Sequence, residues 1–199
     1  MARRVLHDQF FKKAKDEGYA SRAAYKLMQL DEKFSLLRPG DRVLDLGCAP
    51  GSWLQVAGER VGPSGAVLGL DLHRVRLGLP AHVRTIEGDV EAIDAPALVE
   101  QAGGLFDVVM SDMGPKTTGH NDHFLSVRLC DAALGLALRC LKPTGHLAMK
   151  VLEGSEYRRL LDDVGELFAT CKGYKPAASR SVSREMYIVG KGFVGIAPG

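Results

Sequence analysis

Residues 42–53 read Arg-Val-Leu-Asp-Leu-Gly-Cys-Ala-Pro-Gly-Ser-Trp, and this stretch indicates how the chain folds. Its first half, 42–47, is an apolar run without polar alternation that stops at a glycine, which is typical of a strand buried on both faces. Residues 52–60 then have apolar positions at helical spacing. A buried strand, a glycine loop and a helix in succession form the repeating unit of an α/β sheet.

The same alternation of strand and helix continues along the chain. We expect further buried strands at 66–71, 83–87, 106–112 and 146–151, and a helix over 122–141 that stops before Pro143. A last strand, 184–190, follows residues 173–176 too closely for a crossover helix, so we expect it to pair antiparallel at the edge of the sheet. These six strands predict a Rossmann-like, doubly wound, mostly parallel sheet, and we expect seven strands in all.

The composition is that of one globular domain covering residues 1–199. Hydrophobic residues make up 46% and charged residues 25%, and no apolar run reaches the roughly 18 residues that span a membrane. The first 18 residues carry scattered charges rather than an apolar stretch, so we expect no secretory signal. The four cysteines have no CxxC spacing and are expected to be the reduced thiols of a cytoplasmic protein.

Positive charge is concentrated near the two ends of the sequence. Residues 1–38 hold nine Lys or Arg against five Asp or Glu, residues 170–191 hold five against one, and the residues between them are net acidic. Residues 1–38 also have a helical composition, so we expect a basic helical extension ahead of a sheet core at 39–193. Such basic segments either contact anionic partners or are terminal helices whose lysines are simply exposed to water. The charge distribution alone leaves both interpretations open.

Glycines and aspartates follow the predicted strands where a cofactor would lie. Gly47 and Gly51 frame the loop after the first strand. Asp71 ends the second strand and Asp89 follows the third. Ligands of open α/β sheets bind beyond the carboxyl ends of the strands, where Asp71 can accept both hydroxyls of a ribose and Asp89 can meet an adenine edge. The alternative is that these residues are turn glycines and helix-capping aspartates.

The loop after the first strand differs from a dinucleotide-binding loop. The third glycine of a GxGxxG pattern is absent, and Pro50 stands in the turn. A loop of this kind fits a nucleoside sulfonium, which has no phosphate to hold, better than it fits a pyrophosphate. S-adenosylmethionine is therefore the cofactor that we expect.

Five motifs resemble those of the RrmJ/FtsJ family of RNA ribose 2′-O-methyltransferases. They lie at 21–27, 45–53, 111–113, 149–151 and 183–187, in the family's order. The resemblance covers about residues 18–190 and implies a class I methyltransferase domain that methylates a ribose 2′-hydroxyl in RNA. Within the family it implies a uridine of large-subunit (23S) ribosomal RNA as the acceptor. Ser52 stands where the family often has a second glycine, a small change.

The resemblance also assigns residues to the reaction. It implies a catalytic tetrad of Lys26, Asp112, Lys150 and Glu185. It adds Trp53 and Asp112 to the cofactor contacts Gly47, Gly51, Asp71 and Asp89. Because a 2′-hydroxyl is little ionised at neutral pH, either an ammonium stabilises the developing alkoxide or a desolvated lysine accepts the proton. Lys150 is the candidate for this role, and a snorkelling surface lysine is the alternative.

The basic ends would form a cationic rim for RNA phosphates if both ends border the tetrad. The residues concerned are Arg3, Arg4, Lys12, Lys13, Lys15, Arg22, Lys172, Lys175, Arg180 and Arg184. Another RNA such as tRNA, a small-molecule methyltransferase and a non-catalytic RNA-binding module are the alternatives. His120 and His123 form an HxxH without a third ligand, so we expect no metal. We also expect a monomer with no membrane or DNA partner.

Overall fold

Seven strands form one sheet in the part of the chain that the computed structural model describes, residues 2–115, 122–180 and 182–195. The strands are β1 (Arg42–Leu46), β2 (Ala66–Asp71), β3 (Val83–Glu87), β4 (Phe106–Ser111), β5 (Leu141–Leu152), β6 (Phe168–Tyr174) and β7 (Glu185–Phe193). The helices are α1 (Ala2–Asp16), α2 (Ala24–Phe34), α3 (Ser52–Val61), α4 (Ala95–Ala102), α5 (Asp122–Cys140) and α6 (Tyr157–Leu167). The strand order β3-β2-β1-β4-β5-β7-β6 confirms the doubly wound α/β fold.

β7 is the reversed strand of the sheet. It is antiparallel to both β5 and β6, whereas β1 to β5 pair in parallel. The antiparallel pairing is confirmed, but β7 lies one place inside the edge that the sequence predicts, because β6 pairs with its outer side. Most of β6 is exposed, so no apolar run reveals it in the sequence.

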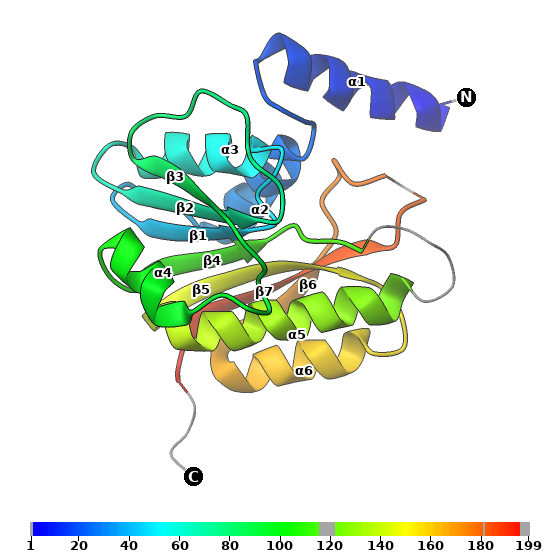
Figure 1. Ribbon diagram of the computed structural model, residues 1–199. Coiled ribbons are helices and arrows are strands. Elements are labelled where there is room, and N and C mark those ends of the chain that lie inside the picture. Colours follow the sequence, from blue (N-terminus) through cyan, green and yellow to red (C-terminus); the bar gives the residue numbers. More distant parts are fainter. Residues whose placement is uncertain (1, 116–121, 181, 196–199) are drawn as a thin grey trace.

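Helices cover both faces of the sheet (Figure 1). α5 packs on β4 and β5, and α6 packs on β6, while α3 packs on β1 and β2 from the opposite face with α2 against it. Neighbouring residues of β1 enter different cores, since Leu44 belongs to the apolar cluster that includes α5 and Val43 to the cluster that includes α3. The strand is therefore buried on both faces, as its Val- and Leu-rich sequence without polar alternation predicts.

The N-terminal extension lies at the end of the sheet where the parallel strands finish. α1 packs through Ala14 against Tyr25 of α2 and against Ala178 of the loop between β6 and β7. Figure 1 shows this loop and the first residues of α5 toward the same end of the molecule. No helix among the described residues is long and apolar enough to cross a bilayer. The four cysteines are free thiols.

A substitution at Gly190 of β7 tests how tightly the outer strands β6 and β7 pack. A Cβ atom at position 190 would lie 2.7 Å from Cγ of the Phe168 ring. Gly190→Ala should therefore lower the free energy of unfolding by about 1–3 kcal/mol, the usual cost of overpacking, as measured by urea denaturation.

Gly135→Ala on α5 is the matched control for Gly190→Ala. A Cβ atom at position 135 would meet nothing within 4 Å. Because alanine favours the helix over glycine by about 1 kcal/mol, this variant should be as stable as the wild type or more stable. Unchanged stability of Gly190→Ala would contradict the tight contact with Phe168.

Candidate functional site

A cavity of about 550 Å³ opens beyond the carboxyl ends of β1, β2, β4 and β5. Its volume lies within the range of roughly 300–1,000 Å³ that is usual for small-molecule sites. Four of the six expected cofactor contacts line it, namely Gly47, Asp71, Asp89 and Asp112, and so does Lys150. The strand ends that the sequence singles out therefore surround one space.

The two glycines of the loop after β1 have conformations that favour glycine. Gly47 has φ +76°, and a Cβ atom there would lie 2.5 Å from Cγ of Met113. Gly51, at the start of α3, has φ +115°, and a Cβ atom there would lie 2.5 Å from Cδ1 of Leu77. Gly47 lines the cavity, whereas Gly51 is not part of its lining. The positive φ and the close approach of Leu77 explain why a glycine stands at position 51, and its contact with the cofactor stays a prediction.

Asp71 and Asp89 are held in place by backbone amides. Asp71 accepts hydrogen bonds from the amides of Ala49, at 2.9 Å, and of His73, at 2.7 Å. Asp89 accepts one from the amide of Glu91 at 3.0 Å. A carboxylate offers about four acceptor positions, so each side chain keeps oxygen lone pairs for a ligand in the cavity.

Trp53, for which the resemblance implies a cofactor contact, is not among the residues that line the cavity. Its side chain is buried, and its Nε1 donates a hydrogen bond of 2.8 Å to the carbonyl oxygen of Ala23. Its ring stacks on the ring of Tyr187, with 5.9 Å between the centroids. Trp53 therefore connects α3 with the N-terminal extension and with β7.

Asp45 of β1 is an acidic residue of the site to which the sequence analysis gives no role. It is completely buried, and neither carboxylate oxygen has a hydrogen-bond partner among the described residues. Burial, and then the negative charges of Asp112 and Asp71, raises the pKa of this carboxyl well above its usual value. The sequence signal that could have identified Asp45 as a buried acidic residue is its position between Leu44 and Leu46 in the predicted strand.

These acidic groups decide which ligands suit the cavity. Asp71, Asp89 and Asp112 line it, and Asp45 lies close enough to Asp71 and Asp112 to interact with their charges. A phosphate group would be repelled by this set, whereas a ligand with positive charges would be stabilised. S-adenosylmethionine carries a sulfonium, an ammonium and ribose hydroxyls, and no phosphate, so the residues present fit it.

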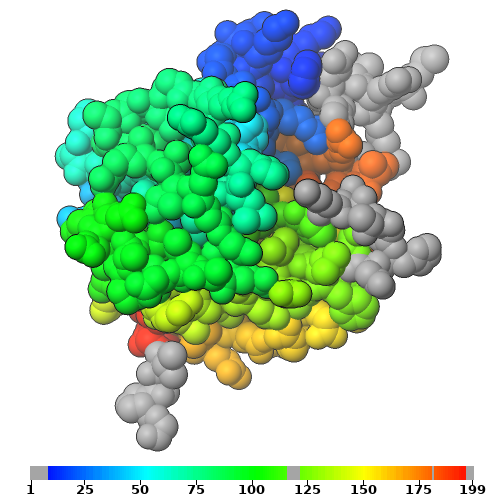
Figure 2. Space-filling view, in the orientation of Figure 1, coloured from blue at the N-terminus to red at the C-terminus, as the bar shows by residue number. Residues whose placement is uncertain are grey.

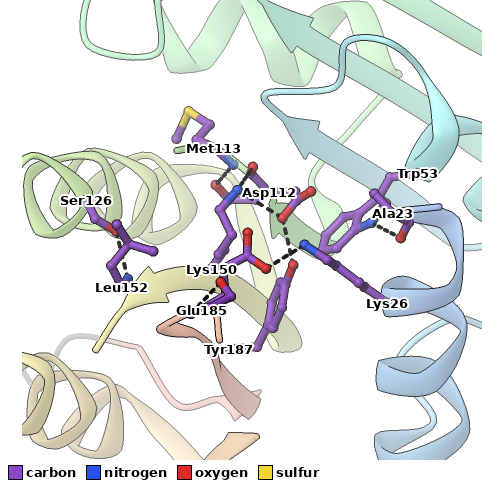
Figure 3. A network of polar contacts seen from close by, with 12 residues as sticks. Ala23, Lys26, Trp53, Asp112, Met113, Ser126, Lys150, Leu152, Glu185 and Tyr187 are labelled. Carbon is purple, nitrogen blue, oxygen red and sulfur yellow. Dashed lines mark hydrogen bonds and ion pairs between the residues drawn. The ribbon is translucent and has the colours of Figure 1, made fainter. Parts of the chain in front are cut away.

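The four residues of the expected tetrad form two ion pairs beside the cavity (Figure 3). Nζ of Lys26 lies 2.9 Å from Oε2 of Glu185, and Nζ of Lys150 lies 3.2 Å from Oδ1 of Asp112. The two lysine side chains are only 7% and 11% exposed. The lysines come from α2 and β5, and Glu185 begins β7, so the fold brings together residues that are far apart in the sequence.

Tyr187 is a second residue of the site that the sequence analysis quotes only as part of a motif. Its hydroxyl donates a hydrogen bond of 2.7 Å to Oδ1 of Asp112. Burial, and then the charge of Asp112, raises the pKa of Tyr187 well above its usual value, so the hydroxyl stays protonated as a donor. Lys150 also donates a hydrogen bond to the backbone carbonyl of Asp112. Asp112 is thus held from two sides.

Metal binding has no support in the part of the chain that the structure covers. None of its His, Cys, Asp and Glu residues gather in groups of three or more that could hold a metal ion. His120 lies outside the described residues. His123 packs its ring against Phe124, with 4.0 Å between the centroids.

Comparison with known proteins gives consistent matches over almost the whole chain. A family model described as FtsJ-like methyltransferase matches residues 19–193. The "Ribosomal RNA large subunit methyltransferase E" of Syntrophobacter fumaroxidans is 44% identical over 188 residues, which cover 94% of this chain and 95% of that protein. The protein of the same name from Methanothermobacter thermautotrophicus is 43% identical, with 94% and 90% of the two chains covered.

A solved structure has the same fold. It is a crystal structure from Plasmodium falciparum, described as that of a ribosomal RNA methyltransferase, with a TM-score of 0.79 and 28% sequence identity. The match covers 89% of this chain and 100% of the other.

The raised pKa of Asp45 predicts how stability changes with pH. Between the usual carboxyl pKa and the raised value, the folded protein binds a proton that the unfolded chain has released. Asp45 therefore makes the protein less stable as pH rises through this window. Asp45→Asn should remove this loss, so the free energy of unfolding of the variant relative to that of the wild type should be higher at pH 7 than at pH 4.

Urea denaturation between pH 4 and pH 8, without ligand, measures the difference between wild type and Asp45→Asn. Asp162→Asn is the control, because Asp162 is an exposed carboxylate that pairs with Arg158 on α6. If the free energies of unfolding of wild type and Asp45→Asn differ by the same amount at every pH, the pKa of Asp45 is not raised by folding. This result would contradict the prediction.

Proposed function

The chain belongs to the FtsJ-like methyltransferase family, and we propose that it transfers a methyl group from S-adenosylmethionine to a ribose 2′-hydroxyl of RNA. The acceptor we propose is a uridine of large-subunit ribosomal RNA. The names of the relatives support the large-subunit ribosomal RNA, and the uridine is what the family resemblance implies. The observation that carries the proposal is the pair of partly buried lysine–carboxylate contacts at the edge of an acidic cavity. The enzyme would act as a monomer in the cytoplasm.

The cavity supplies the contacts for the cofactor. Asp71 would accept the ribose hydroxyls, and Asp89 would meet the adenine edge, with the backbone amides on the other side of each carboxylate fixing its orientation. Asp112 would compensate the positive charges of the ligand. When bound, the cofactor supplies a methyl group activated by a sulfonium centre.

Lys150 is the residue that we place at the acceptor hydroxyl. It lines the cavity, and Asp112 holds its ammonium group through the side chain and through the backbone carbonyl. From this position the ammonium can stabilise the developing 2′-alkoxide, or a neutral Lys150 can take the hydroxyl proton. In both cases the contacts with Asp112 would keep Lys150 at the cavity.

Lys26 and Glu185 form the other side of the site. Their contact joins α2 to the start of β7 and closes the ring of charges around the acceptor. We propose that Lys26 adds positive charge near the reacting oxygen and that Glu185 positions it. Both residues therefore contribute through electrostatics rather than through a covalent step.

Two other functions remain to be separated by experiment. A small-molecule methyltransferase would need elements that enclose its substrate, whereas the extension here is short and basic. A non-catalytic RNA-binding module would not need two buried lysines that are held by carboxylates beside a cofactor cavity. A different RNA, such as tRNA, would leave the chemistry unchanged.

The reaction is tested with S-adenosylmethionine carrying a labelled methyl group. Transfer to unmodified 23S RNA and to large ribosomal subunits that lack the modification is measured first, and the labelled nucleotide is mapped. A synthetic fragment with a single 2′-deoxy residue at that nucleotide should then accept no label. Label on the deoxy fragment would exclude ribose 2′-O chemistry, and transfer to small molecules alone would exclude RNA as the acceptor.

Lys150→Met tests the proposed role of the lysine. Methionine keeps most of the length of the lysine side chain without its charge, so transfer should fall by about 10²–10⁴-fold, the usual contribution of a general base or acid. Affinity for S-adenosylmethionine, measured by calorimetry, should change by no more than about twofold. Lys33→Met is the control, because Lys33 is an exposed residue of α2. Unchanged transfer by Lys150→Met would remove Lys150 from the reaction.

A further inference from the structure

The end of β5 that carries Lys150 has a partner strand on one side only. β5 pairs with β7 as far as Leu152, which lies opposite Glu185. Its described pairing with β4 stops earlier, at Ser111 opposite Met149. The backbone groups of Lys150 and Leu152 on the β4 side therefore need hydrogen-bond partners from another part of the chain.

These backbone groups point toward the side that β4 has left. Glu153, the residue after Leu152, donates its amide at 2.8 Å to the carbonyl oxygen of Arg184, which precedes β7. Neighbouring residues of a strand direct their amides and carbonyls to opposite sides, so residues 150 and 152 direct theirs away from β7. A backbone group that is removed from water is unfavourable without a partner.

α5 supplies a partner for each of the two residues. Sγ of Cys130 donates a hydrogen bond of 3.0 Å to the carbonyl oxygen of Lys150, and the amide of Leu152 donates one of 2.9 Å to Oγ of Ser126. Ser126 and Cys130 are four residues apart, so they lie on one face of the helix. Figure 3 shows the contact between Ser126 and Leu152 beside the lysine.

Both side chains lie on the buried face of α5. Val127 of this face belongs to the apolar core, whereas Arg128 is exposed on the outer face, which reaches the molecular surface (Figure 2, yellow-green). Burial, and then the charge of Asp131, raises the pKa of the Cys130 thiol to about 12, so the thiol stays protonated and can donate. Burying a polar group is unfavourable unless it is hydrogen-bonded, and Ser126 and Cys130 bond to the end of β5.

His123 extends the contact by one more turn of the same helix face. A Cβ atom at Gly154 would lie 2.9 Å from Cδ2 of the His123 ring. Residues 123, 126 and 130 of α5 therefore meet residues 154, 152 and 150 in turn. The end of β5 is docked along the first turns of α5 over this whole length.

We propose that Ser126 and Cys130 are positioning residues for Lys150, because they replace β4 as the partner of β5 where the lysine leaves the sheet. The inference rests on the proposed function, since it takes Lys150 as the residue at the acceptor hydroxyl. Lys150 contacts Asp112, the residue that follows the end of β4. Its side chain thus bridges the gap that opens between the two strands, and α5 fixes the width of this gap.

Loss of these contacts should affect the rate more than the binding of the cofactor. A displacement of about 1 Å at a reacting group can lower a rate by about 10²-fold. The strand end would keep its pairing with β7, so the displacement and the loss should be smaller than this limit. Ser126 and Cys130 are not among the residues that line the cavity, so its shape should change little.

Three variants test the positioning role by comparing kcat with cofactor affinity. Cys130→Ala and Ser126→Ala should each lower kcat by about tenfold, while calorimetry shows the Kd of S-adenosylmethionine within about twofold of wild type. Cys130→Ser keeps a hydrogen-bond donor and should restore kcat to within about threefold of wild type. Equal losses in Cys130→Ala and Cys130→Ser would overturn the role of the hydrogen bond.

Cys140→Ala is the matched control on the same helix. Cys140 is also a buried thiol of α5, but its contact is with the carbonyl oxygen of Ala95, at 3.9 Å. The two cysteine-to-alanine variants should lower Tm by similar amounts, since each loses one buried sulfur, and only Cys130→Ala should lose kcat. An equal loss of kcat in Cys140→Ala would make the effect one of stability and overturn the inference.

Amide hydrogen exchange, followed by NMR, tests the docking of the strand end without any methyl transfer. In Ser126→Ala the amide of Leu152 should exchange at least about tenfold faster than in wild type, because its buried acceptor is gone. The amide of Ala148, between β4 and β7 in the sheet, should exchange as slowly as before. Unchanged exchange at Leu152 would overturn the contact with α5, whatever the acceptor of the methyl group is.

The outcomes separate this inference from the proposed function. Wild-type kcat in both Cys130→Ala and Ser126→Ala, with Lys150→Met inactive, would overturn the positioning role and leave the proposed function intact. Label found elsewhere than on a ribose would exclude the proposed acceptor. A loss of kcat in Cys130→Ala that Cys130→Ser restores would still support the positioning of Lys150.

Discussion

Two lysines that are largely removed from solvent, Lys26 and Lys150, govern how the site is built. An ammonium removed from water is unfavourable unless a carboxylate lies against it, and removing one partner of such a pair leaves an uncompensated charge. Lys26 therefore requires Glu185, and Lys150 requires Asp112. Because Lys26 belongs to the extension and Glu185 to β7, the first pair ties the extension to the sheet. Docking of the extension and completion of the site are one event.

The reversal of β7 is what makes this pairing possible. An antiparallel strand begins where its parallel neighbours end, and Lys150 of β5 is opposite Tyr187 while Leu152 is opposite Glu185. Residues 185 and 187 are two apart in a strand, so their side chains point to the same face. One strand therefore supplies both the counter-ion of Lys26 and the hydrogen-bond donor of Asp112 (Figure 3).

The sequence predicts the parts of the molecule that periodicity and strand ends determine. The run 42–47 predicts its own burial on both faces, and the carboxyl-end rule places Asp71 and Asp89 at the cavity before any coordinates are known. β6 is missed because an exposed strand has no apolar run, and the position of β7 depends on it.

The sequence does not predict the role of a side chain when that role depends on residues far away along the chain. Trp53 lies in the cofactor motif, yet its direction follows from a carbonyl of the extension and the ring of Tyr187. Asp45 looks like an ordinary motif residue, and its isolation is visible only once the strands around it are in place. The stacked indole has a further consequence, since Trp53 is the chain's one tryptophan. The intrinsic fluorescence of the protein thus originates at the junction between the extension, the sheet and the tyrosine on Asp112, an optical reporter of that junction that needs no label.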